Sequence, residues 1–156
     1  MLKNNKIVSA IGMVGGTKTA PRCLGDGFYI QEDNVAVEFN IPPANTRDEF
    51  ISNILYGIQL CNNELPNGAI TVPLTSHQFK MSQLKNPKAN EFGCSSDRNA
   101  WEGGVHNPKP GIPTDGLRCT GGHVAIGFPF DNCDERDVLA NVIVQWMDIL
   151  AAVPSV

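Results

Sequence analysis

FYIQEDNVAVEFN, residues 28–40, is the stretch that decides the fold. It predicts two strands, residues 28–31 and 34–40, separated by Glu32-Asp33 as a hairpin or bulge. Side chains alternate along a strand, so the apolar ones of the second strand share one face: Val35, Val37 and Phe39. The other face of the same strand then carries Glu38.

A helix over residues 47–62 follows this hairpin. Thr46 and Glu49 have the spacing of a capping box, in which each side chain satisfies a backbone donor of the first turn. The predicted apolar stripe of the helix recurs at helical spacing, at Phe50, Ile51, Ile54, Leu55 and Ile58.

The remaining elements are predicted from shorter signals. Residues 6–11, 68–74 and 117–128 are typical of strands, and residues 12–27 of a loop. Residues 75–116 show little periodicity, and because so long a structureless loop is uncommon we expect strands or turns within them. A second helix is predicted where acidic residues precede another apolar stripe, at Asp134, Glu135 and Asp137, then Val138, Leu139, Val142, Ile143, Trp146, Met147 and Leu150.

Composition limits the class of protein. The chain has 156 residues, 42% of them hydrophobic, which fits one domain over residues 1–156 with a single core. Its 15 Gly and 11 Pro with only 18% charged residues favour a loop-rich α/β or α+β domain. A net charge of -4 with scattered Lys and Arg argues against nucleic acid as a partner.

The sequence also bears on location. Its five cysteines have no C-x-x-C pair, which predicts buried or free thiols in a reducing compartment. No apolar run approaches the about 20 residues needed to cross a bilayer, and the N-terminus lacks a signal-peptide apolar region. We therefore expect a cytosolic protein with no membrane partner.

Two polar residues on the predicted strands are candidate site residues. Glu38 lies in a core-like strand, where a carboxylate costs free energy unless it pairs or holds a cation; the alternative is an outward-facing acid on a half-exposed sheet. His123 follows Gly121-Gly122 and is suited to metal, phosphate or proton transfer, whereas a lone strand histidine is otherwise a hydrogen-bonded structural residue.

Further candidates lie in loops and at strand ends, each with a simpler alternative. Gly15-Gly16-Thr17-Lys18 is typical of a backbone cradle with a cation, suited to phosphate or carboxylate, or is a plain Gly-Gly turn. Asp33-Asn34 either helps to hold Mg2+ or makes a turn. Arg118 holds a phosphate or carboxylate, or forms a surface ion pair. Asp97-Arg98-Asn99, before Trp101, contacts substrate or forms a solvated turn.

Five short runs occur in a distinctive order along the chain. They are VSAIG (8–12), GGTK (15–18), QEDNVAVEFNIPPA (31–44), FGCSSD (92–97) and RCTGGH (118–123). In this order they resemble the phage-type ATP-dependent carboxylate–amine (COOH–NH2) ligase family, type 2, across nearly the whole chain.

The resemblance implies a fold and a reaction. The fold would be α+β and similar to glutamine synthetase and glutamate–cysteine ligase, with a curved, mainly antiparallel sheet that has helices packed on one face and carries ATP and Mg2+. The enzymes of this family phosphorylate a carboxylate and let an amine displace the phosphate to form an amide. By position, Glu38 and His123 would bind metal, His123, Lys18 and Asn34 would contact the nucleotide, and Arg118 and Lys18 would steady the acyl phosphate.

The chain also departs from the family pattern. The family opens with a Gly-x-Asp-Pro-Glu strand that would precede Met1, and Ala125 stands where the family has a second histidine. A later Arg-rich segment and Glu-bearing strand would follow Val156. Two expectations result: a truncated ligase domain, or a non-catalytic phage structural or binding protein that keeps the fold. Unpaired sheet edges predict a homo-oligomer or a phage protein partner, in the host cytoplasm or the virion.

Overall fold

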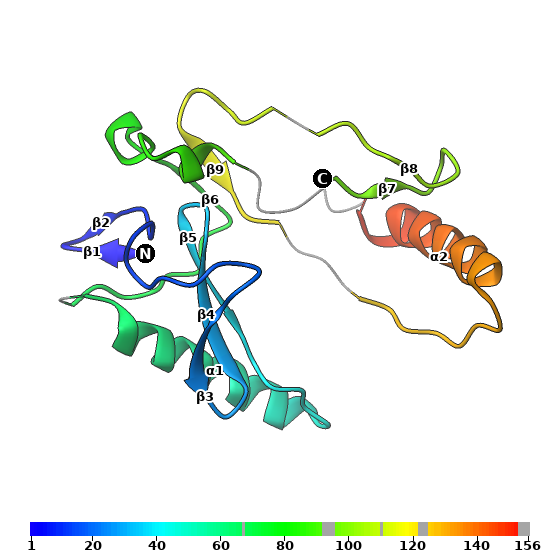
Figure 1. Cartoon of the computed structure of the whole chain (residues 1–156), viewed down its shortest axis with the longest axis horizontal. Coiled ribbons are helices and arrows are strands. Elements are labelled where there is room, and N and C mark those ends of the chain that lie inside the picture. Colours follow the sequence, from blue (N-terminus) through cyan, green and yellow to red (C-terminus); the bar gives the residue numbers. More distant parts are fainter. Residues whose placement is uncertain (67, 92–95, 110, 122–124, 153–156) are drawn as a thin grey trace. The chain divides into compact units, whose positions relative to one another are not determined.

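The computed structural model describes residues 1–66, 68–91, 96–109, 111–121 and 125–152. Within these residues the chain is mixed α and β, with small antiparallel sheets and two α-helices (Figure 1). Contacts divide the chain into two units, residues 1–93 with 112–121 and residues 94–111 with 122–156. The expected single domain stays a prediction, and each unit is described by itself.

A three-stranded antiparallel sheet forms the centre of the first unit. Its strands lie in the order β3 (Arg22–Gly25), β4 (Phe28–Asp33) and β5 (Ala36–Asn40). The predicted hairpin is therefore confirmed. Its turn lies at residues 34–35, later than predicted, because Glu32 and Asp33 still pair with Val37 and Ala36 of β5.

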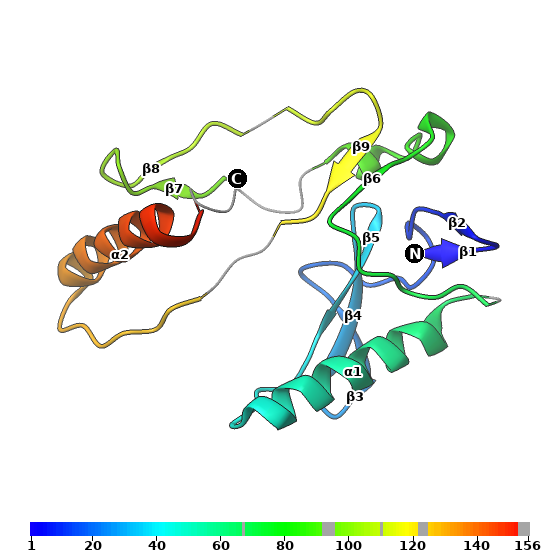
Figure 2. The same ribbon diagram turned by 180° about the vertical axis from the view of Figure 1, so that it is seen from behind.

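The helix α1 (Arg47–Glu64) lies along this sheet in both views (Figures 1 and 2). Its predicted cap is confirmed: the Thr46 hydroxyl accepts a bond from the Glu49 N–H at 3.2 Å, and the Glu49 carboxylate accepts one from the Asn45 N–H at 2.8 Å. These bonds satisfy donors that the first turn would otherwise leave unpaired.

The helix contacts the sheet through small residues rather than through the predicted stripe. Gly57 and Cys61 are its buried residues, and a Cβ added at Gly57 would lie 2.7 Å from the Phe39 ring. Phe50, Ile51 and Leu55 are exposed, while Ile54 and Ile58 are half-buried. The predicted stripe was thus wrong for its exposed members, because the close approach at Gly57 determines which side of the helix meets the sheet.

Short paired segments complete the first unit. β1 (Leu2–Lys3) pairs with β2 (Lys6–Ile7), and β6 (Ser76–Gln78) pairs with β9 (Leu117–Cys119). Single turns of 3-10 helix occur at Met81–Gln83 and Pro87–Asn90. The expectation of hidden strands and turns between residues 75 and 116 is confirmed.

Three predicted strands are shorter in the structure. Of residues 6–11, only β2 pairs with another strand. After it, the Ser9 hydroxyl accepts a hydrogen bond from the Ile11 N–H, and local side-chain bonds of this kind compete with the backbone bonds of a sheet. Residues 68–74 contribute only an isolated bridge at Ile70. The strand predicted over residues 117–128 ends at Cys119, and residues 122–124 lie outside the described part. Conversely, the loop predicted over residues 12–27 contains β3.

Two clusters of buried residues form the core of the first unit. Ile30, with no exposed surface, lies in the first cluster together with Met1, Val14, Cys61, Leu65 and Ala69. The second cluster consists of Val35, Phe79, Leu84 and Ala89. The hairpin contributes to both clusters, which explains why the sheet and the loops around it are held as one unit.

The second unit has little buried surface among its described residues. Its elements are a hairpin of β7 (Arg98–Asn99) and β8 (Val105–His106) and the helix α2 (Cys133–Met147). The helix α2 continues as a π-helical turn over Asp148–Ala152. Asn132 caps α2 by accepting a bond from the Glu135 N–H at 2.9 Å, so the predicted acidic start is confirmed. Much of its apolar stripe is exposed, at Val138, Val142, Trp146, Met147 and Leu150.

No helix within the described residues is long and apolar enough to cross a membrane. The four described cysteines are unpaired. Cys61 is buried, and burial raises the pKa of its thiol to about 11, whereas the other three are exposed. The prediction of buried or free thiols is confirmed for these four residues.

Candidate functional site

The face of the sheet opposite α1 carries the main candidate, Glu38. Facing residues of an antiparallel pair share a side, so the register places Gln31 beside Glu38, with Asp33 diagonal to Glu38. Ile30 and Phe39 lie opposite each other on the other side, toward α1. The sequence prediction that Glu38 lies on the face away from Phe39 is confirmed.

Gln31 is the buried polar partner of Glu38. Only 4% of Gln31 is exposed, and its amide Nε2 donates a hydrogen bond to Glu38 Oε2 at 2.7 Å. Glu38 itself is half-buried. A buried amide fixes the direction of the carboxylate and leaves lone pairs for a further donor or a cation. Sequence reasoning missed this role of Gln31, although the hairpin register would place the two residues opposite each other.

Asn34 occupies the tight turn between β4 and β5, where its φ is 54°. Asparagine tolerates this left-handed region better than most residues. The turn, one of the two alternatives that the sequence left for Asp33-Asn34, is therefore observed. Its amide Nδ2 donates to the Glu91 carbonyl at 2.8 Å. Its Oδ1 is buried and accepts no hydrogen bond from the described residues, and a buried acceptor without a partner is uncommon and costly.

The loop at residues 12–16 is a cradle that already holds a carboxylate. Glu32 Oε1 accepts hydrogen bonds from the backbone N–H of Val14 at 3.1 Å and of Gly15 at 2.9 Å. Burial acts to raise the pKa of Glu32, but backbone N–H groups of residues 12–15 outweigh it and lower that pKa. Of the cradle predicted at residues 15–18, the Gly15 N–H therefore binds the chain's own anion, together with the N–H of Val14 just before it.

Sequence reasoning missed Glu32 because it placed this residue in the hairpin turn rather than in the strand. Lys18, the predicted cation of the same loop, is exposed. It forms no hydrogen bond or ion pair with the described residues, so its charge is available to a ligand.

Arg118, on β9, uses its guanidinium within the protein. It donates to the carbonyls of Ala89 at 3.1 Å, Pro113 at 3.1 Å and Leu117 at 2.7 Å, and to Asn90 Oδ1 at 2.8 Å. Among the described residues it pairs with no carboxylate, so the ion pair weighed from sequence is not found there. Arg118 instead holds the turn at residues 87–90 against β9.

Two further sequence candidates fall partly or wholly outside the described residues. His123 lies outside them, as do residues 92–95 of the run FGCSSD. The part of that run that is described continues into the second unit, where Asp97, Arg98 and Asn99 line a hollow of about 410 Å3 together with Trp101 and Asp148. Trp101 Nε1 donates to Asp148 Oδ2 at 2.9 Å, which fixes the indole at the rim. The solvated-turn and substrate alternatives both stay open.

A second hollow, of about 480 Å3, lies in the first unit. Val8, Ile11 and Met13 of the N-terminal loop line it together with Gln83 and Lys85. Gln83 Oε1 accepts a hydrogen bond from the Ser9 N–H at 2.9 Å, which holds the N-terminal loop beside this turn. The hollow is open and mainly apolar, and none of the predicted site residues lines it.

The described residues place two carboxylates on one face of the sheet. They contain no cluster of three or more His, Cys, Asp or Glu that could hold a metal ion. Mg2+ is commonly bound through only one or two protein carboxylates, with substrate phosphates and water as the other ligands. Glu38, with Asp33 diagonal to it on the same face, fits this smaller requirement.

The candidate site on this face therefore consists of Glu38 with its buried partner Gln31 and the Asn34 turn nearby. The cradle at residues 12–16 is separate from it, because Glu32 pairs with Val37 and lies on the α1 side of the sheet with Ile30 and Phe39. Comparison of the chain with protein-family models, curated proteins and solved structures found no match.

Proposed function

We propose that this chain forms part of an ATP-dependent carboxylate–amine ligase, in which the face of β4 and β5 opposite α1 carries the nucleotide site. The observation that supports this most directly is the Gln31–Glu38 pair, a buried amide that orients a carboxylate at 2.7 Å. Such an arrangement pre-sets one ligand for a divalent cation. The runs of sequence that resemble the ligase family add the reaction class.

In this proposal Glu38 and Asp33 would hold Mg2+. The resemblance also implies a metal-binding role for His123, which lies outside the described residues. When bound, Mg2+ would neutralise charge on the phosphate oxygens during transfer. Asn34 would contact the nucleotide at the turn between β4 and β5, and Lys18 would pair with its phosphates. Because four of its five N–H donors are already bonded within the chain, we assign Arg118 a positioning role: it holds the turn at residues 87–90, next to Glu91, whose carbonyl bonds Asn34.

The resemblance to the ligase family implies the chemistry of this proposal. The carboxylate substrate attacks the terminal phosphate of ATP and forms an acyl phosphate with release of ADP. The amine then attacks the acyl carbon, phosphate leaves, and an amide bond remains. Shelter from water is needed because water would hydrolyse the acyl phosphate. We propose a curved, glutamine-synthetase-like sheet with helices on one face for this purpose, and the position of α1 against one side of β3–β5 supports it.

Glu38→Gln tests the site without removing its partner, because the glutamine oxygen can still accept the Gln31 bond. We expect the affinity for ATP with Mg2+ to fall about 10-fold or more, since a neutral amide is a poorer cation ligand than a carboxylate. Isothermal titration calorimetry measures this, with Glu102→Gln as the control for loss of one negative charge at an exposed residue.

Equal affinity in the wild-type chain and in Glu38→Gln would remove Glu38 from the site. If the wild-type chain binds no nucleotide while its circular dichroism is that of a folded protein, the proposed ligase site does not function in this chain. The second candidate below would then be favoured.

The second candidate is a non-catalytic binding or structural protein, and the exposed apolar stripe of α2 favours it. Val138 is 64% exposed, Val142 42% and Trp146 60%, on one side of the helix. In this candidate a second copy of the chain covers these residues, in the host cytoplasm or in a phage particle.

Sedimentation velocity at micromolar concentration tests this candidate. We expect wild-type chains to associate and Val142→Glu to shift the species to monomer, because a buried carboxylate in an apolar contact is strongly unfavourable. Gln59→Glu, on the exposed side of α1, is the charge-matched control. A monomeric wild-type chain would count against this candidate.

A further inference from the structure

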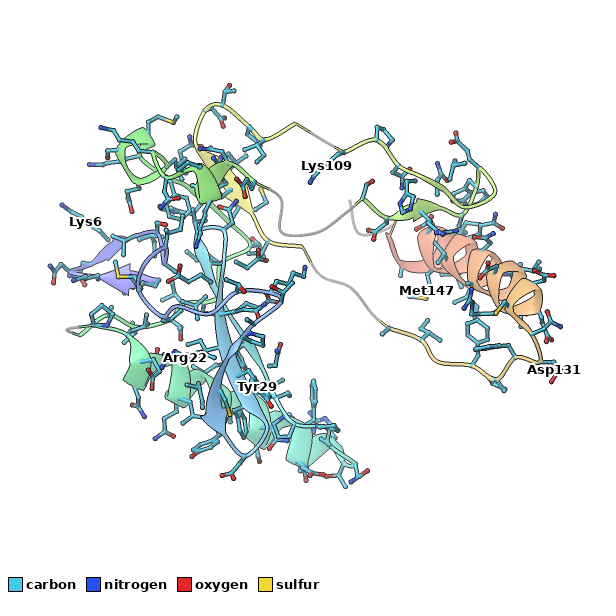
Figure 3. The ribbon with its side chains drawn as sticks, viewed as in Figure 1. Lys6, Arg22, Tyr29, Lys109, Asp131 and Met147 are labelled. Atoms are coloured by element: carbon cyan, nitrogen blue, oxygen red, sulfur yellow. The ribbon has the colours of Figure 1, made fainter. Side chains whose placement is uncertain are left out.

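The cradle at residues 12–16 is held in place by contacts that do not involve Glu32. Arg22 Nε donates to the Val14 carbonyl at 2.9 Å, and Arg22 also pairs with Glu64 of α1 at 2.6 Å (Figure 3). Gly16 lies so close to β4 that a Cβ there would be 2.6 Å from the Ile30 carbonyl oxygen. The cradle therefore keeps its position when the Glu32 side chain turns away.

The backbone of this loop is shaped for an anion. Gly12, Gly15 and Gly16 have φ values of 78°, 68° and 75°, in the left-handed region that glycine adopts without strain. At Val14 an ordinary residue is followed by the left-handed Gly15, and such a step turns successive N–H groups toward one point. Concave groups of N–H donors of this kind bind anions. In the structure this point is occupied by Glu32 Oε1.

The N–H groups of Val14 and Gly15 can hold one anion at a time. Glu32 reaches them from β4, and within the described part of the chain its carboxylate bonds only to backbone N–H groups. The charged side chains on the neighbouring segments are Arg22, which is paired with Glu64, Asp33 beside Glu32, and the unpaired Lys18. A free anion would thus gain the same backbone donors and the added attraction of Lys18.

We propose that the loop at residues 12–18 is a binding site for a small oxyanion, a phosphate-type group or a carboxylate, which binds by displacing the Glu32 carboxylate from the backbone N–H groups of Val14 and Gly15. Glu32 then acts as an internal competitor that sets the anion concentration at which the site fills. This inference requires no ligase chemistry, because it concerns inorganic anions as well as substrates.

Removal of the competitor is the first test. The probe is inorganic sulfate at constant ionic strength. We expect Glu32→Ala to bind sulfate about 10-fold more tightly than the wild-type chain does. In the wild-type chain sulfate must first displace the Glu32 carboxylate from the two N–H groups, whereas in the variant these donors have no carboxylate to give up. Glu102→Ala is the control for the change in net charge and should match the wild type. In the double variant Glu32→Ala/Lys18→Gln part of the gain should be lost.

Glu32→Gln is the second test and keeps the length of the side chain. Its amide oxygen can still accept from the N–H groups of Val14 and Gly15, but a neutral acceptor competes less strongly with an anion than a carboxylate does. We therefore expect sulfate to bind this variant more tightly than the wild-type chain and less tightly than Glu32→Ala.

Acetate at neutral pH distinguishes the two sources of anion. Comparable tightening of acetate and sulfate in Glu32→Ala assigns the site to carboxylates as well, while tightening of sulfate alone assigns it to phosphate-type groups. The proposal is overturned if folded Glu32→Ala binds neither anion more tightly than wild type. If circular dichroism shows that this variant unfolds, the folded Glu32→Gln variant decides, and a sulfate affinity equal to that of the wild-type chain overturns the proposal.

Discussion

Ile30→Ala is expected to lower the free energy of unfolding by about 2–5 kcal/mol, the range for large-to-small changes in a packed core. Ile30 has no exposed surface and lies at the centre of the cluster that joins β4 to α1 and to the N-terminal loop. Removal of three carbons there leaves a cavity bordered by Val14 and Cys61. Because domains of this size have about 5–15 kcal/mol of stability, the loss is a large fraction of the total.

Urea denaturation followed by circular dichroism measures this change. Ile51→Ala is the matched control, because Ile51 lies on the exposed side of α1 and is 38% exposed. The control should lose much less stability, since part of its side chain already contacts water. Equal losses in the two variants would contradict the placement of Ile30 in the core.

Gly16→Ala is expected to cost about 2–5 kcal/mol of stability from two sources. The added Cβ would lie 2.6 Å from the Ile30 carbonyl oxygen and 3.1 Å from the Arg22 backbone nitrogen. These atoms belong to paired strands and cannot move away without breaking the ladder. A φ of 75° adds strain, because an L-residue with a side chain disfavours this region.

Gly15→Ala separates the two sources. Gly15 has a φ of 68°, but a Cβ there would meet nothing within 4 Å, and its N–H to Glu32 is retained. We expect a loss of only about 1–2 kcal/mol, from backbone strain alone. Thermal unfolding of the two variants side by side gives the comparison. If Gly16→Ala is as stable as Gly15→Ala, the loop does not pack directly on β4.

The sequence was most informative where local interactions dominate. The hairpin of β4 and β5 follows from alternation, and the start of α1 follows from the Thr46 side chain, which bonds to a nearby backbone donor. The start of α2 was predicted from its acidic residues, and its Asn132 cap was found only in the structure. It was least informative for short strands. Residues 68–74 have an apolar pattern but only a bridge at Ile70, because a strand also requires a partner edge of matching length.

For the candidate site, the sequence identified Glu38 and the cradle at residues 15–18 as chemically important positions. It did not identify their partners. Gln31 was passed over as an ordinary strand residue, and Glu32 was placed in the turn. Gln31 contacts Glu38, 7 residues away in the chain, and Glu32 contacts Gly15, 17 residues away. The type of a side chain does not by itself specify such contacts.

The sequence by itself thus determined an antiparallel hairpin, a capped helix, a second helix with an acidic start, and a glycine-rich loop suited to an anion, since each depends on neighbours within a few residues. Only the tertiary structure decided which anion occupies that loop and which side of α1 meets the sheet. The physical reason is packing. Gly16 and Gly57 allow close approach at two points, and these approaches fix the positions of the loop against β4 and of α1 against Phe39.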